Sequence, residues 1–347
     1  MAREHTVEDY LELRLISSAE ISPDGSTLVF ATSRTYREKG KTMEGSIVIR
    51  SLGNPDLSRE LFEADTRNYA PAISPEGKRI AYLQKRDKLN SLVIYNIDNG
   101  QDERIILGTE PSQISWLDDG SIAVLMAEAE KDEIKRAKEA GDDGFYFEEE
   151  EKYSSIFIYR PGQGFQRITE GIQVWEFSVS GKSIVFVGSD LPTESSWYHS
   201  SIYKLRIGDN NLEKVYTPEW RTVARPRMSA DNKKVAFLES LWSDRGVVSG
   251  DILVTDIATG KTVNTTENHD RSYSDMHWSG DGMLHAIWTR DGSAGFATFN
   301  GKWEYSCLPM IGPSIPTFSP KSLSLSTLSM RVFIQPTIAS PGKPGAG

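Results

Sequence analysis

The chain has 347 residues, of which 38% are hydrophobic and 25% charged, so it contains ample apolar material for a folded core. Asp and Glu number 49 against 39 Lys and Arg, which gives a net charge of −10. This balance argues against binding to nucleic acid or to an anionic membrane surface, because both partners attract a basic face.

The first predicted element is a short helix within residues 1–18. Val7, Tyr10 and Leu11 share one helical face, Leu15 extends that face, and Thr6 is suited to cap the helix. We therefore separate 1–18, an N-terminal helical segment, from a main domain at 19–334.

The main domain contains a repeat of about fifty residues. Each copy has a Ser, a polar turn that ends near Gly or Asn, and then an alternating apolar run, as in Ile21–Phe30. Such turns favour tight hairpins. A second β-rich hairpin follows in most copies, for example 91–97 with its turn at 98–100. The six clear copies are anchored at Ser22, Ser74, Ser115, Ser178, Ser229 and Ser279.

Four strands in about fifty residues are typical of a β-propeller blade. A weaker seventh copy begins at Phe318, has Ser319 as its anchor and covers 318–334. We predict an all-β, seven-bladed β-propeller with four-stranded antiparallel blades and a degenerate last blade. A β-solenoid of stacked hairpins is the alternative, although solenoid coils are usually shorter.

Two further segments depart from the repeat. The insert at 127–153 interrupts the third copy, and its residues 128–152 include 11 acidic and 5 basic side chains. Ile134 and Ala137 share a face of a predicted helix there, which is either a solvated arm or an element that contacts a partner domain. The Pro- and Gly-rich tail at 335–347 is predicted to be disordered.

Four stretches carry a family resemblance: the opening helix Val7–Leu11, the first copy Ile21–Phe30, the charged insert 131–143, and Val174–Ser178. Over about residues 6–330, the chain resembles the N-terminal β-propeller of the prolyl oligopeptidase family of serine peptidases. The archaeal acylaminoacyl-peptidase (acyl-peptide hydrolase) branch is the most similar. Blade turns of this kind also occur in TolB-like propellers, so the resemblance depends on the combination of features.

The resemblance implies that an α/β-hydrolase domain with a G-x-S-x-G nucleophile should follow the propeller. In that family the propeller covers the active-site cleft and filters substrates by size. The nearest string here is Gly312–Pro316, in which Pro316 replaces the second Gly. We therefore expect no catalytic residue in this chain, no enzymatic activity by itself, and a hydrolase domain or chain supplied separately.

Histidines offer the only hint of a metal site. His269, His277 and His285 fall in the sixth copy. A four-residue turn at 279–282 would pair His277 with Leu284 and point His285 to the other face of the sheet. We therefore expect no metal site and no cofactor.

Cys307 is the single cysteine, which excludes an intrachain disulfide, and its neighbours predict a buried thiol. No apolar run approaches the roughly 18 residues of a membrane span. Met1–Arg14 lacks the apolar core of a signal peptide. These features predict a cytoplasmic protein.

The loop at 189–199 is the best candidate for binding, because it is rich in aromatic and polar residues and propeller loops concentrate binding. We predict contacts with a peptide or partner from Trp197, Tyr198 and His199; the alternative is a packed loop between blades.

Two other functions remain open. A stand-alone TolB-like or WD-repeat-like propeller would act as a scaffold for proteins or peptides, and a channel enzyme would need ligands that converge from several blades. Homo-oligomerisation is left open by the sequence.

Overall fold

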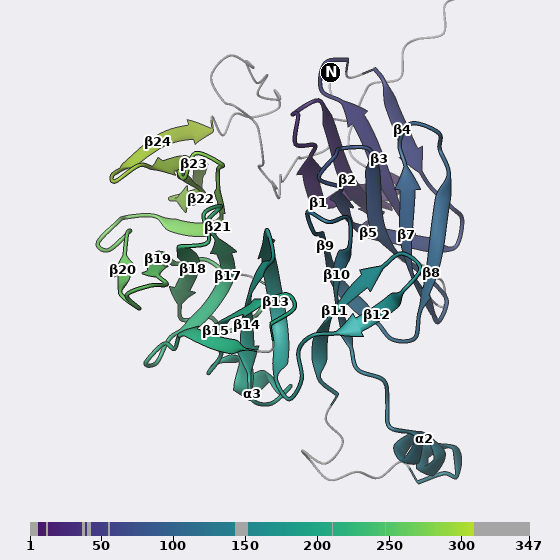
Figure 1. The fold of residues 1–347 in the computed structure, drawn as a ribbon. Coiled ribbons are helices and arrows are strands. Elements are labelled where there is room, and N and C mark those ends of the chain that lie inside the picture. Colours follow the sequence, from purple (N-terminus) through teal and green to yellow (C-terminus); the bar gives the residue numbers. More distant parts are fainter. Residues whose placement is uncertain are drawn as a thin grey trace, which may run out of the picture.

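The computed structural model describes residues 6–308 except 12, 37–38, 40–42, 55, 143–151, 210 and 247. Within these residues the chain forms six consecutive four-stranded units with antiparallel pairing, which we number blades 1 to 6 (Figure 1). The predicted seventh copy at 318–334 and the tail at 335–347 lie outside the described residues.

The first three blades take their strands in chain order. Blade 1 comprises β1 (Arg14–Ile21), β2 (Thr27–Arg34), β3 (Gly45–Ser51) and β4 (Ser58–Leu61). Blade 2 comprises β5 (Thr66–Ile73), β6 (Arg79–Arg86), β7 (Leu89–Asn96) and β8 (Asp102–Leu107). Blade 3 comprises β9 (Pro111–Trp116), β10 (Ile122–Ala127), β11 (Ser154–Arg160) and β12 (Gly164–Arg167).

The remaining three blades repeat this order. Blade 4 comprises β13 (Gln173–Ser180), β14 (Ser183–Ser189), β15 (Ser201–Arg206) and β16 (Leu212–Tyr216). Blade 5 comprises β17 (Thr222–Met228), β18 (Lys234–Ser240), β19 (Asp251–Asp256) and β20 (Thr262–Asn264). Blade 6 comprises β21 (Ser272–Trp278), β22 (Leu284–Arg290), β23 (Ser293–Phe299) and β24 (Trp303–Leu308).

The core is divided among the contacts between consecutive blades. Five clusters of buried apolar side chains lie between blades 1 and 2, 2 and 3, 3 and 4, 4 and 5, and 5 and 6. The first strands of consecutive blades pack against one another, so they line the inside of the arrangement. Successive side chains of a strand point to opposite faces of the sheet. In an inner blade both faces pack against a neighbouring blade, so successive residues can all be apolar, which explains the repeated apolar runs in the sequence.

The hairpin between the first two strands is built around a buried Ser in three clear cases. Ser229 Oγ accepts a hydrogen bond from the Lys234 N–H at 2.9 Å and donates one to Asp231 at 2.7 Å. In the same way, the hydroxyls of Ser22 and Ser74 accept hydrogen bonds from the backbone N–H groups five residues later, at 2.9 and 3.0 Å. This arrangement satisfies backbone groups that the tight turn would otherwise leave unpaired, and it confirms the predicted turns.

Two of the predicted anchor serines are displaced by two residues. In blade 3, Leu117 occupies the anchor position: its N–H bonds to the Ser121 carbonyl and its carbonyl accepts from Gly120. In blade 4, Ser180 pairs directly with Ser183 across a two-residue turn. Ser115 and Ser178 therefore lie on the strands, because turns of different lengths move the anchor relative to the apolar pattern.

Helices are few in the described residues. The N-terminal helix α1 covers only Val7–Leu11, and β1 already begins at Arg14, so Leu15 lies in a strand and not in the predicted helix. The insert forms α2 (Asp132–Glu139), which has no buried residue and projects away from blade 3 (Figure 1). The third helix, α3 (Glu194–Trp197), lies between β14 and β15.

The prediction that the Cys307 thiol is buried was wrong. Cys307 lies on β24, which pairs only with β23 among the described strands, and its side chain is exposed. The local sequence resembles that of a core strand, but β24 is the outermost strand of its blade.

Candidate functional site

One end of the six blades carries the long loops. Because neighbouring strands are antiparallel, the connection from the second to the third strand leaves from the same end as the connection to the next blade. We call this end the loop face. It bears the insert at 128–153, the connection at 190–200, which holds most of the predicted binding loop 189–199, and the loop at 241–250. The first two meet where the Tyr153 hydroxyl donates to the Asp190 carbonyl at 3.0 Å.

The structure separates the three predicted binding residues. Trp197 is 4% exposed and packs among the core residues of blades 5 and 6, with its ring centroid 6.2 Å from that of Trp242. Tyr198 is half-buried and donates its hydroxyl to the Ser243 carbonyl at 3.0 Å. His199 is exposed. The Trp197 ring therefore serves packing in this conformation, and a binding role for the loop remains a prediction.

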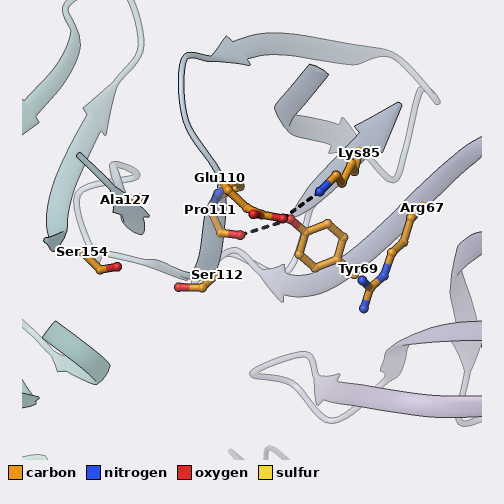
Figure 2. A pocket seen from close by; sticks show the side chains of 8 residues that line it. All are labelled: Arg67, Tyr69, Lys85, Glu110, Pro111, Ser112, Ala127 and Ser154. Atoms are coloured by element: carbon orange, nitrogen blue, oxygen red, sulfur yellow. Dashed lines mark hydrogen bonds and ion pairs between the residues drawn. The ribbon is translucent and has the colours of Figure 1, made fainter. Parts of the chain in front are cut away.

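A pocket of about 390 Å3 opens between blades 2 and 3 on the loop face (Figure 2). Its volume falls in the range of about 300–1,000 Å3 that is typical of small-ligand sites. Side chains from both blades and from their connection line it: Arg67 and Tyr69 of β5, Lys85 of β6, Glu110, Ser112 of β9, and Ser154 of β11.

Tyr69 is the central side chain of this pocket. Its hydroxyl donates to the Pro111 carbonyl of blade 3 at 3.1 Å, and the Arg67 guanidinium carbon lies 5.0 Å from its ring centroid. Burial raises the pKa of Tyr69 to about 12, so the phenol stays protonated to a higher pH than an ordinary tyrosine does. The Lys85 ammonium pairs with the Glu110 carboxylate at 2.8 Å.

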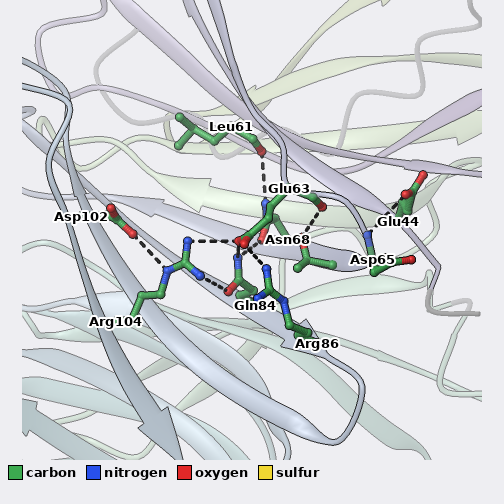
Figure 3. Close-up of polar contacts among 10 residues, drawn as sticks. Glu44, Leu61, Glu63, Asp65, Asn68, Gln84, Arg86, Asp102 and Arg104 are labelled. Carbon is green, nitrogen blue, oxygen red and sulfur yellow. Dashed lines mark hydrogen bonds and ion pairs between the residues drawn. The ribbon is translucent and has the colours of Figure 1, made fainter.

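The start of β5 is held on its other side by a polar network (Figure 3). The Glu63 carboxylate forms ion pairs with Arg86 and, at 3.1 Å, with Arg104. Its backbone carbonyl accepts a hydrogen bond from the Thr66 hydroxyl at 2.6 Å. Gln84 donates to Asn68 at 2.9 Å within the same network, where both side chains are buried. The backbone that carries Arg67 and Tyr69 is thereby fixed to the rest of blade 2.

A close backbone approach joins blades 1 and 2 at the same place. Gly45 of β3 pairs in parallel with Arg67 of β5. A Cβ at position 45 would lie 2.8 Å from the Asn68 carbonyl oxygen, so a side chain there would push the two strands apart.

The histidines of blade 6 are arranged differently from the prediction. The turn spans five residues, so His277 pairs with His285, and Trp278 pairs with Leu284. Both imidazoles thus share one face. Burial, with a contribution from Arg227, lowers the pKa of His277 to about 4. His285 contacts the Thr298 hydroxyl at 3.0 Å, and the described part of the chain holds no group of three metal-ligating side chains.

Charged side chains of the first strands connect blades 4, 5 and 6. Arg225 lies 3.0 Å from Glu176, and Arg227 lies 2.8 Å from Asp275. Sequence reasoning found neither these pairs nor the Arg67–Tyr69 pocket. No motif marks them, because each depends on residues more than 40 positions apart in the sequence that meet across a blade boundary.

No family model matches the chain, and no curated protein matches its sequence. Among the helices of the described residues, none is long and apolar enough to cross a membrane.

Solved structures of peptidase propellers are similar to the chain. The acylaminoacyl peptidase of Pyrococcus horikoshii matches with a TM-score of 0.63 and 13% identity, over 86% of this chain and 46% of that chain. The β-propeller domain of the Trilobed protease from Pyrococcus furiosus matches with a TM-score of 0.59 and 13% identity, over 86% of each chain. A prolyl endopeptidase matches with a TM-score of 0.59 and 16% identity, over 86% of this chain and 44% of that chain.

The chain thus spans about half the length of the acylaminoacyl peptidase. At such low identity the likeness concerns the fold, and it agrees with the resemblance found in the sequence. The chain has the β-propeller fold of the propeller domains of acylaminoacyl peptidase and prolyl oligopeptidase family members.

Proposed function

We propose that this chain is the substrate-gating propeller portion of an acylaminoacyl-peptidase-like serine peptidase and is non-catalytic by itself. The observation that carries the proposal is the extent of the structural match. The chain covers 86% of an isolated peptidase propeller domain but only 46% of a whole acylaminoacyl peptidase. The partners that follow from this proposal are a hydrolase domain or chain and short peptides, in the cytoplasm.

The loop face supports a gating role. It combines a ligand-sized pocket with an arm whose helix α2 has no buried residue and whose surrounding insert is strongly acidic. Loops on a rigid scaffold are where binding concentrates, and the blade cores provide that scaffold.

We also propose that the predicted copy at 318–334 completes a seventh blade. Two sheet faces favour this: Phe30 and Val48 alternate with the core residues of blade 1, and Ile287 and Phe296 alternate with those of blade 6. All four are half-buried apolar side chains that point away from the neighbouring described blade.

The purified chain tests the proposal in two assays. Alone, it should not hydrolyse acyl-amino-acid or short-peptide p-nitroanilides. Mixed with the isolated hydrolase domain of an acylaminoacyl peptidase, it should bind that domain and slow the cleavage of a long peptide more than that of a short one. Turnover by the pure chain would contradict the non-catalytic assignment, and an unchanged ratio of long- to short-peptide cleavage would contradict gating.

A further inference from the structure

We propose that the pocket between blades 2 and 3 binds the C-terminal carboxylate of a short peptide, with Arg67 as the residue that pairs with it. This inference deepens the proposed function and rests on it only for the nature of the ligand, a peptide.

The charges of the pocket favour an anion. Its lining includes two cations, Arg67 and Lys85, and one carboxylate, Glu110. Lys85 and Glu110 pair at 2.8 Å, whereas no carboxylate of the described residues forms an ion pair with Arg67. One guanidinium is therefore available. Its planar fork matches a carboxylate through two parallel N–H···O hydrogen bonds.

The Arg67 side chain is positioned before a ligand arrives. It lies over the Tyr69 ring at 5.0 Å, and Tyr69 is anchored to blade 3 through its hydrogen bond to Pro111. In Figure 2 both side chains lie on one side of the pocket, opposite Ser112 and Ser154. A cation held on an aromatic ring loses less conformational freedom on binding than a free side chain would.

The other lining groups suit the end of a peptide. Pro111 and Ala127 provide apolar surface, and the Ser154 hydroxyl provides a hydrogen-bonding group, whereas the Ser112 hydroxyl donates to the Leu125 carbonyl at 3.4 Å. A volume of about 390 Å3 accommodates a terminal residue with its carboxylate but not a folded segment. An acidic side chain would offer the same carboxylate. We assign the terminus because every peptide carries one, whatever its sequence.

Calorimetric titration at low salt provides the test, with three peptides. These are acetyl-Ala-Ala-Ala with a free carboxylate, the same peptide as its amide, and acetyl-Glu-Ala-Ala amide. We expect the free acid to bind the wild-type chain at least about tenfold more tightly than its amide, as for a charged hydrogen-bonded pair.

Arg67→Met should remove this preference while it keeps the apolar stem over Tyr69. Arg206→Met is the matched control. Arg206 is also exposed, also lacks an ion pair with any described carboxylate, and lines a second pocket at the opposite end of blade 4. The control should retain the preference, and thermal unfolding should show both variants folded.

Equal binding of acid and amide, no binding of the acid, or an unchanged preference in Arg67→Met would overturn the site. Tight binding of the glutamyl amide would keep the carboxylate site but overturn its assignment to a peptide terminus. Each result is a direct binding measurement, so it stands apart from the peptidase and gating assays above.

Discussion

Glu20 shows how one residue couples the folding of this propeller to pH. Its carboxylate lies on β1 and accepts the Ile73 N–H of blade 2 at 2.8 Å. Burial raises its pKa from 4.5 to about 7, against a smaller lowering by the Ile73 hydrogen bond. The folded state therefore binds the Glu20 proton more tightly than the unfolded chain does.

The stability that protonated Glu20 contributes is complete below about pH 4.5 and is lost as the pH rises through about 7. Glu20→Gln keeps an oxygen acceptor for Ile73 and removes the titration. The free energy of unfolding of the wild type should thus fall by about 1–3 kcal/mol relative to that of Glu20→Gln between pH 4.5 and 7.5. Urea unfolding of both proteins measures this, and parallel pH profiles would show that Glu20 is not the group responsible.

At the scale of an element, the turn between the first and second strands of a blade determines which serine hydroxyls contribute to stability. Ser229 bonds both to the Lys234 N–H and to Asp231, whereas Ser115, which the sequence pattern treats as equivalent, lies on a strand outside the turn. Ser229→Ala should destabilise the protein by about 1–2 kcal/mol, because it leaves a backbone N–H without its partner.

Ser115→Ala is the control for this element and should cost less than about 0.5 kcal/mol. Chemical denaturation compares the two variants directly. Similar losses from both substitutions would mean that the hydroxyl bonds do not hold the turn.

At the scale of the whole molecule, stability depends on whether the two end blades are covered. The half-buried side chains of Phe30 and Val48 on blade 1, and of Ile287 and Phe296 on blade 6, point away from their described neighbours. If the seventh copy fills this position, a chain that ends after Leu308 should bind more of a fluorescent hydrophobic dye and should self-associate.

Light scattering and dye fluorescence compare this shortened chain with the full one. A shortened chain that remains a monodisperse monomer, with unchanged dye binding, would contradict the seventh blade. A full-length chain in which Phe30 is replaced by Ser provides a second measure, because it should be destabilised only if that face is covered.

The repeat, the strands and the fold class can be predicted from local sequence patterns. Alternating apolar residues such as Leu28–Phe30, and turn residues such as Pro23–Gly25, act locally, so their pattern is legible without knowledge of distant contacts. The exact pairing register of the strands is harder to predict from the sequence. One extra residue in the turn of blade 6 moves His285 from the opposite face of the sheet to the same face as His277.

The place where binding groups gather depends on contacts between blades. Arg67 and Tyr69 have no local signature, and they acquire a role because blade 3 contributes Pro111, Ser112 and Ser154 across the boundary. Trp197 illustrates the converse, since an aromatic loop residue that suggests binding in the sequence is buried against the cores of later blades. The physical reason is that blade interfaces join segments more than 40 residues apart in the sequence, and no local pattern encodes which side chains meet there.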